Sequence, residues 1–144
     1  MLINEAINYR EAILALLSSE KLPEDDLSAT LENFLVATGD DELTGTIGLE
    51  IYGDYGLLRS LVVKPAFRNQ NIASKLVAQI ETLASSKGLR AIFLLTETAP
   101  DYFARKGYQK ITRNEVPAEV QRSSEFSHAC PQSAIVMKKD INKQ

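Results

Sequence analysis

The sequence predicts a single mixed α/β domain in which one β-sheet carries helices on both faces. Its 144 residues are 44% hydrophobic and 24% charged, which is enough for one core and leaves little room for two. Short apolar runs alternate along the chain with segments whose apolar residues recur at helical spacing. This alternation is typical of a sheet whose strands are joined by helices.

The first helix is expected to begin at Asn8, a common N-cap residue, with Glu11 three positions later completing a capping box. A strand precedes this helix at residues 2–3, and the acidic turn at residues 23–26 leads into a short second helix. The buried stripe of the first helix is expected to contain Ala12, Ile13, Leu16 and Leu17.

Three strands are expected next, at residues 31–38, 43–52 and 57–63. Turns rich in glycine and acidic residues separate them, at residues 39–42 and 53–56. The second strand should carry Ile47, Leu49 and Ile51 on one face. The third is almost continuously apolar, as expected of a central strand that is covered on both faces.

The second half begins with the longest helical pattern, and Gly88 is a suitable residue to end it. Residues 91–96 read as another central strand, and Pro100 begins a short helix that ends at Gly107. A strand at residues 108–112, a helical turn at residues 117–123 and a last strand at residues 134–138 complete the order. The helical pattern consists of Ile72, Leu76, Val77, Ile80, Leu83 and Ala84.

Composition excludes several classes of protein. Sixteen basic and nineteen acidic residues give a net charge of −3, without the basic excess typical of nucleic-acid binding. One cysteine and one histidine do not form a usual zinc site. Apolar runs are too short for a bilayer span, and the N-terminus lacks a signal-peptide pattern. We therefore expect a cytoplasmic monomer or homodimer without metal, membrane or nucleic-acid partners.

The segment from residue 57 to residue 75 is the most informative. A buried strand runs into a short loop and then into a helix, whose first-turn N–H groups and dipole favour a bound phosphate. Asn71 tolerates a left-handed backbone, Ala73 is small, and Arg68 and Lys75 supply positive charge. The spacing alone leaves a second interpretation open, a plain connection with solvated polar side chains.

This segment resembles the acetyl-CoA signature of the GNAT acetyltransferases, Val-x-Pro-x-x-Arg-x-x-Gly-x-Gly/Ala. Asn71 stands where the signature has its first glycine, and an asparagine can keep the same backbone shape. Its side chain crowds the phosphates somewhat. The matching residues are Val63, Pro65, Arg68, Ile72 and Ala73.

A second resemblance lies downstream, in the family pattern Asn-x-x-Ala-x-x-Phe-Tyr-x-x-x-Gly-Phe/Tyr. Ala99, Gly107 and Tyr108 match it directly. Thr96 stands at the position of the family's cofactor-binding asparagine. Phe103 stands where many members have a tyrosine that protonates the leaving thiolate.

The resemblance covers about residues 1–112 in the order of elements and residues 57–108 in motif. It implies that residues 1–144 form one GNAT domain, with a mixed, mostly antiparallel sheet of six to seven strands in which the fourth and fifth strands splay apart. It also implies acetyl-CoA as co-substrate and direct acetyl transfer to a small amine in a ternary complex. The residues it assigns to the cofactor are Leu61, Val62, Val63, Arg68, Asn69, Gln70, Asn71, Ile72, Ala73, Ser74, Thr96, Ala99 and Phe103.

Other interpretations of the function remain open. Asn71 and Phe103 are also compatible with a degenerate member that binds coenzyme A as a sensor or partner module. An unrelated α/β domain that binds another phosphate compound is a third possibility. Residues 125–134 and the strand at residues 58–63 resemble small acetyltransferases associated with arsenic-resistance operons.

No residue is identified as catalytic, and three are candidates. Arg59 could hold a substrate carboxylate or be a buried arginine paired with an acid such as Glu50. Glu97 could attract an amine, or it could cap a helix or be solvated. Tyr102 could act chemically or pack in the core.

The single histidine and the single cysteine have two interpretations each. His128 could be a general base or a solvated surface residue. Cys130 could bind a soft metal or act as a nucleophile, or it could be a small buried apolar residue.

Overall fold

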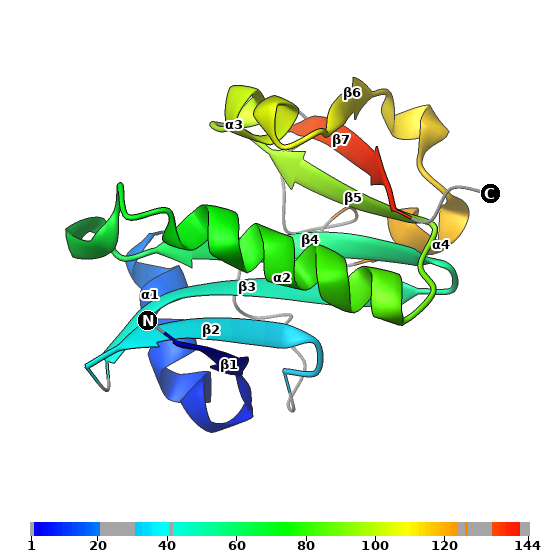
Figure 1. The fold of residues 1–144 in the computed structure, drawn as a ribbon. Coiled ribbons are helices and arrows are strands. Elements are labelled where there is room, and N and C mark those ends of the chain that lie inside the picture. Colours follow the sequence, from blue (N-terminus) through cyan, green and yellow to red (C-terminus); the bar gives the residue numbers. More distant parts are fainter. Residues whose placement is uncertain (1, 21–30, 41, 124–125, 127–133, 142–144) are drawn as a thin grey trace. The chain divides into compact units, whose positions relative to one another are not determined.

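The computed structural model in Figure 1 describes residues 2–20, 31–40, 42–123, 126 and 134–141. The chain forms two compact units. The first unit consists of Met1–Glu50 and Arg59–Leu83, and the second of Ile51–Leu58 and Ala84–Gln144. Two long strands, β3 (Glu42–Tyr52) and β4 (Tyr55–Val63), contribute residues to both units.

The described residues form a seven-stranded sheet with the order β1-β2-β3-β4-β5-β7-β6. Strand β4 pairs with β5 in parallel, whereas the pairs β1–β2, β2–β3, β5–β7 and β6–β7 are antiparallel. The predicted mixed α/β fold is therefore confirmed. The remaining strands are β1 (Leu2–Glu5), β2 (Phe34–Gly39), β5 (Ala91–Thr96), β6 (Gln109–Ile111) and β7 (Ile135–Asp140).

The parallel ladder between β4 and β5 is short. It joins Tyr55, Gly56 and Leu57 to residues 91–93, although β4 continues to Val63. A splay between the fourth and fifth strands requires such an early end of the ladder.

The helices are distributed over both units. The first unit contains η1 (Ile7–Tyr9), α1 (Arg10–Ser19), η2 (Pro65–Phe67) and most of α2 (Ile72–Ser86). The second unit contains α3 (Pro100–Arg105), η3 (Arg113–Glu115) and α4 (Ala118–Gln121).

The predicted start of the first helix is wrong. Asn8 lies inside η1, and α1 begins at Arg10 without a side-chain cap. The reason is that the Tyr9 N–H already donates to the Ala6 carbonyl at 2.8 Å, so the chain turns before it reaches Asn8. Ala12 is exposed rather than buried, and the helix predicted after residues 23–26 falls outside the described residues.

Several predicted strand boundaries also shift. Strand β2 begins at Phe34 because Leu31 and Asn33 have left-handed backbones, with φ of 52° and 62°. Tyr55 already belongs to β4, so the turn before it is shorter than predicted. Ile51 is 36% exposed, whereas Ile47 and Leu49 are buried as expected.

Towards the C-terminus, β6, α4 and β7 each lie within a few residues of the predicted segments. The short helix that was expected to run on to Gly107 ends at Arg105. The central strand predicted at residues 91–96 is confirmed as β5.

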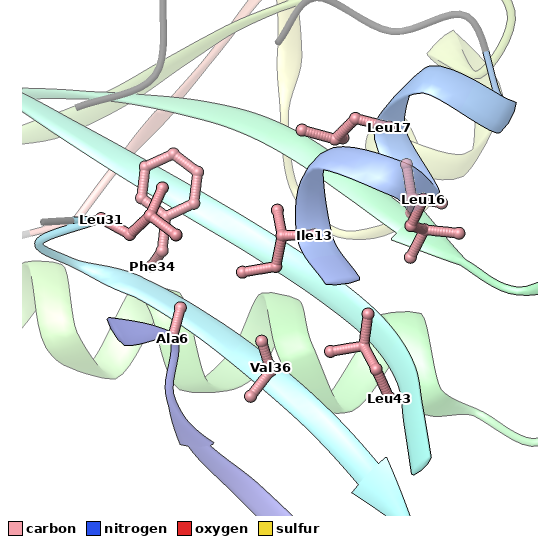
Figure 2. Close-up of a cluster of buried hydrophobic side chains, with 9 residues drawn as sticks. Ala6, Ile13, Leu16, Leu17, Leu31, Phe34, Val36 and Leu43 are labelled. Atoms are coloured by element: carbon pink, nitrogen blue, oxygen red, sulfur yellow. The ribbon is translucent and has the colours of Figure 1, made fainter. Parts of the chain in front are cut away.

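A cluster of apolar side chains joins α1 to the sheet of the first unit. Figure 2 shows side chains of α1 directed at β2 and β3, with α2 on the opposite face of these strands. The cluster contains Ile13, Leu16 and Leu17 from α1, Phe34 and Val36 from β2, Leu43 from β3 and Val62 from β4.

A bulge in β3 lets this strand serve both helices. Thr38 pairs with Leu43 but Ala37 pairs with Gly45, so Thr44 is an extra residue. Leu43 belongs to the cluster under α1, whereas a Cβ on Gly45 would lie 3.3 Å from Leu76 of α2. An extra residue shifts the alternation of side chains by one position, which explains how residues two apart face opposite sides.

The second unit has its own apolar cluster, in which Leu57 of β4 and Phe93 of β5 are almost fully buried. Next to it, Thr112 and Glu115 form a capping box at η3. Hydrogen bonds to the Glu115 carboxyl hold its pKa below its usual range. The backbone N–H of Thr112 has the largest effect and the Thr112 hydroxyl the next largest.

We predict that Gly48→Ala destabilises the protein by about 1–3 kcal/mol, because overpacking of a core has this typical effect. A Cβ at Gly48 would lie 2.4 Å from two ring carbons of Phe34, and Phe34 is 3% exposed and packed in the α1 cluster. Urea unfolding measures the change. Gly39→Ala is the matched control, since its Cβ would meet nothing nearer than 3.8 Å. Equal stability of both variants would contradict the prediction.

Candidate active site

Strand β4 is irregular at Ser60, whose φ of 59° lies in the left-handed region. Arg59 pairs with Glu50 of β3. Glu50 is two residues from Gly48, so both face the same side of the strand. That is the side of α1, because a Cβ on Gly48 would meet Phe34 of the cluster under α1. Val62 also packs under α1. Arg59 and Val62 are three residues apart, which regular alternation would place on opposite faces. Ser60 therefore acts as a bulge residue.

Arg59 is buried, with 1% of its side chain exposed. Its Nη1 lies 3.2 Å from Glu50 Oε2, and its Nε donates to Ser60 Oγ at 3.2 Å. Of the two interpretations of Arg59 from the sequence, this geometry matches the buried arginine paired with Glu50. The side chain of Glu50 is 21% exposed.

The loop between β4 and α2 has two left-handed residues. Asn69 and Asn71 have φ of 66° and 62°, which confirms the left-handed backbone expected of Asn71. The Asn71 carbonyl accepts a hydrogen bond from Lys75 N–H at 3.1 Å, so it closes the first turn of α2. The N–H groups of the residues before Lys75 have no carbonyl partner within the helix. They point along the helix axis beyond its start, where an anion is favoured.

Arg68 lies next to this loop. Its Nε donates to the Val63 carbonyl at 3.1 Å, and its Nη2 forms an ion pair with Glu20 at the C-terminal end of α1. The Arg68 side chain is 52% exposed, so its charge is accessible from solvent. The end of β4, the loop and the end of α1 are thus joined through one guanidinium group.

Burial divides the residues that the resemblance assigns to the cofactor. Val62 and Ile72 are buried, so they have only backbone groups to offer. Leu61, Val63, Ala73 and Ser74 are half-buried, and Arg68, Asn69, Gln70 and Asn71 are exposed. All ten residues belong to the first unit.

The remaining predicted residues belong to the second unit. Thr96, at the end of β5, is 9% exposed, and its Oγ1 accepts a hydrogen bond from Ala99 N–H at 3.0 Å. Phe103 is buried between Tyr102 and Tyr108, with ring centroids 5.3 and 5.7 Å away.

Two of the catalytic candidates also lie in the second unit. Glu97 is exposed, directly after β5. Tyr102 is half-buried, and Lys106 Nζ lies 5.5 Å from the centre of its ring. Tyr102 is thus partly packed and partly accessible, so this environment agrees with either interpretation of the residue.

Two features of the site were not predicted. Nothing in the apolar run of β4 distinguishes Ser60, and no local pattern links Glu20 to Arg68, which is 48 positions away. His128 and Cys130 fall outside the described residues. Within the described ranges no group of three or more metal-binding side chains occurs, and no helix has the length and apolar character of a membrane span.

The sequence pattern of the Acetyltransferase (GNAT) family matches residues 6–112. The chain belongs to this family. The matched region includes β4, the loop with its left-handed asparagines, α2 and α3.

Curated relatives match over part of their length. An amino-acid acetyltransferase of Aeromonas salmonicida is 24% identical over 100 residues, which cover 68% of this chain and 23% of that protein. An uncharacterized N-acetyltransferase of Chlorobaculum tepidum is 30% identical over 93 residues, 64% of this chain and 59% of that protein. The chain thus matches less than two thirds of either relative.

Solved structures share the fold over nearly the whole chain. The Mycobacterium tuberculosis protein Rv2747, solved with CoA, has a TM-score of 0.82 and 24% identity, covering 99% of this chain and 100% of that one. N-acetylglutamate synthase of Neisseria gonorrhoeae, solved with coenzyme A and N-acetyl-glutamate, has a TM-score of 0.80 and 19% identity, covering 99% of this chain and 35% of that one.

We predict that Asn71→Val destabilises this GNAT protein by about 1–2 kcal/mol, because a β-branched residue resists the left-handed backbone. Asn71→Gly should be neutral or stabilising, since glycine adopts this backbone without strain. Thermal and urea unfolding measure both changes. Gln70→Val is the matched control, as an exposed neighbour with no positive φ. A similar loss in Gln70→Val and Asn71→Val would contradict a special backbone role for Asn71.

Proposed function

We propose that this chain transfers the acetyl group of acetyl-CoA to a small amine in one ternary complex, as a single acetyltransferase domain of residues 1–144. One observation carries the proposal: the segment that matches the family's cofactor signature has left-handed Asn69 and Asn71 directly before α2. This backbone exposes the start of a helix to an anion, as a bound pyrophosphate requires.

The residues of the first unit fit the cofactor. The helix start and the exposed guanidinium of Arg68 favour a pyrophosphate, and Ala73 leaves room for its approach. The half-buried Leu61 and Val63 border the backbone along which the pantetheine arm would pair. Thr96, Ala99 and Phe103 are proposed as contacts from the second unit.

The chain would contribute to the reaction in three ways. Acetyl-CoA supplies an acyl group that is activated as a thioester. A backbone N–H near Val63 would donate to the carbonyl oxygen and stabilise the charge that grows there as the amine attacks. The amine must be neutral to attack, so a base or a chain of waters must take its proton. The new N–C bond replaces the C–S bond of the thioester, and coenzyme A leaves as a thiolate that takes up a proton. Positioning of both reactants supplies much of the rate.

The acceptor is proposed from the relatives and the chemistry. Several relatives are named amino-acid acetyltransferases, so we propose amino acids as the first class to test, with polyamines as the second. Membership of the arsenic-operon subgroup is a further proposal, which rests on residues 58–63 and 125–134 of the sequence. An arsonate-bearing amine belongs in the same acceptor screen for that reason.

The degenerate alternative is a coenzyme A sensor without turnover. Phe103 favours it, because phenylalanine has no proton to give to a leaving thiolate. Asn71 is weaker support for the sensor. Its backbone is left-handed, as that of the family's glycine would be, so the shape of the loop is kept. Release of free thiol from acetyl-CoA that depends on an added amine would exclude the sensor.

We predict that acetyl-CoA raises the melting temperature of the protein, because a ligand that binds only the folded state stabilises it. Ala73→Glu should abolish this shift, since it adds bulk and negative charge at the start of α2. Ala78→Glu is the matched control, the same substitution at an exposed position of the same helix. A full shift in Ala73→Glu would show that the cofactor binds elsewhere.

We predict that Tyr102→Phe lowers turnover by less than about tenfold, whereas loss of a general acid typically costs about 10²–10⁴-fold. Neighbours on a helix point about 100° apart, so the side chain of Tyr102 does not point where a tyrosine at position 103 would. Phe103→Tyr should leave turnover equal or higher, because thiols with a pKa near ~8.5 leave without a strong acid. Steady-state kinetics test both, and a hundredfold loss in Tyr102→Phe with intact acetyl-CoA binding would make Tyr102 the acid.

A further inference from the structure

We propose that Arg59 and Glu50 are positioning residues that hold the left-handed backbone of Ser60, and thereby aim the following amides of β4 at the thioester. The inference rests on the proposed acetyl transfer and names the residues that prepare its site. It requires no contact between Arg59 or Glu50 and the substrates.

The first observation is the backbone of Ser60. A serine with φ of 59° lies in a region that residues other than glycine, asparagine and aspartate rarely adopt. Such a conformation persists only where the surroundings enforce it, and it is found preferentially at functional sites. Within a strand it adds a residue to the ladder and turns the chain that follows.

The second observation is the hydrogen bonding of Arg59 in the same unit. Its Nε donates to the hydroxyl of Ser60, and its Nη1 is paired with Glu50 at 3.2 Å. Because the guanidinium is rigid and planar, a bond at Nη1 fixes the direction in which Nε points. Glu50 therefore orients Arg59, and Arg59 in turn holds the side chain of Ser60.

The third observation is the burial of the pair. With 1% of the Arg59 side chain exposed, both charges are largely removed from water, and a buried ion pair of this kind is weak evidence for stability. Its directional effect is larger, since two charged hydrogen bonds define one geometry. The pair thus suits a role in setting the shape of β4.

The consequence concerns the amides after the bulge. Leu61, Val62 and Val63 follow Ser60 in β4, so a rotation at Ser60 changes the direction of each of their N–H groups. A donor that is displaced by about 1 Å can lower the rate of a reaction about 10²-fold. Loss of the left-handed backbone should therefore reduce polarisation of the thioester while the loop between β4 and α2 still binds coenzyme A.

The test uses acetyl-CoA labelled with carbon-13 at the thioester carbonyl, and infrared spectra of the bound form. In the wild-type protein the carbonyl stretch should lie below that of free acetyl-CoA, because a donated hydrogen bond weakens the C=O bond. Ser60→Val should lose most of this shift, since a β-branched residue resists the left-handed backbone. Ser60→Gly should keep it, because glycine adopts that backbone freely. Ser18→Val, an exposed position of α1, is the control.

A rescue experiment separates positioning from substrate contact. Arg59→Lys should lose the shift, as an ammonium group lacks the rigid fork that reaches both partners. Adding Ser60→Gly to Arg59→Lys should restore it, because glycine needs no support. A deficit that persists in the double variant would mean that Arg59 acts otherwise, and would overturn the inference.

The outcomes distinguish this inference from the proposed function. If acetyl-CoA does not raise the melting temperature of the wild-type protein, the proposed function fails. If the wild type binds acetyl-CoA and Ser60→Val keeps the full carbonyl shift, the positioning role fails. Should Arg59→Lys not fold, Glu50→Gln takes its place, because it removes the charge that orients Arg59 and keeps the guanidinium. It should reduce the carbonyl shift, adding Ser60→Gly should restore it, and a full shift in Glu50→Gln would overturn the positioning role.

Discussion

The structure depends on a change of face within β4. The first residues of this strand pair in parallel with β5, and Val62 near its end packs under α1. Regular alternation cannot place both Arg59 and Val62 on the side of α1, so the strand needs the extra residue that the left-handed Ser60 provides. The direction of the Val63 carbonyl, which accepts from Arg68, follows from that turn.

The same solution occurs in the neighbouring strand of the first unit. Thr44 is the extra residue of β3, and it lets Leu43 face α1 while Gly45 faces α2. In β3 the Thr44 hydroxyl donates to the Ala37 carbonyl, and in β4 the Ser60 hydroxyl accepts from Arg59. Both hydroxyl side chains thus form a hydrogen bond at the irregularity.

Local patterns predicted the parts of the fold that depend on local forces. Helix α2 and strand β5 were predicted from apolar periodicity, and the left-handed Asn71 from the tolerance of asparagine for that backbone. Ser60 was not predictable, because its conformation is supported by Arg59 and by Glu50 of another strand. Asn8 was misassigned because the turn that starts at Ala6 decides where the helix begins.

The contacts of Arg68 limit what this one charge could add to the proposed binding of a pyrophosphate. Its guanidinium is shared between Glu20 and the Val63 carbonyl, and an exposed ion pair of this kind contributes about 0–1 kcal/mol. A pyrophosphate, with more charge than one carboxylate, would compete with Glu20 for the same donors. The part of the attraction for a pyrophosphate that does not depend on Arg68 would then come from the backbone N–H groups at the start of α2. The left-handed backbone of Asn71 holds these groups in place whether Arg68 binds Glu20 or the pyrophosphate.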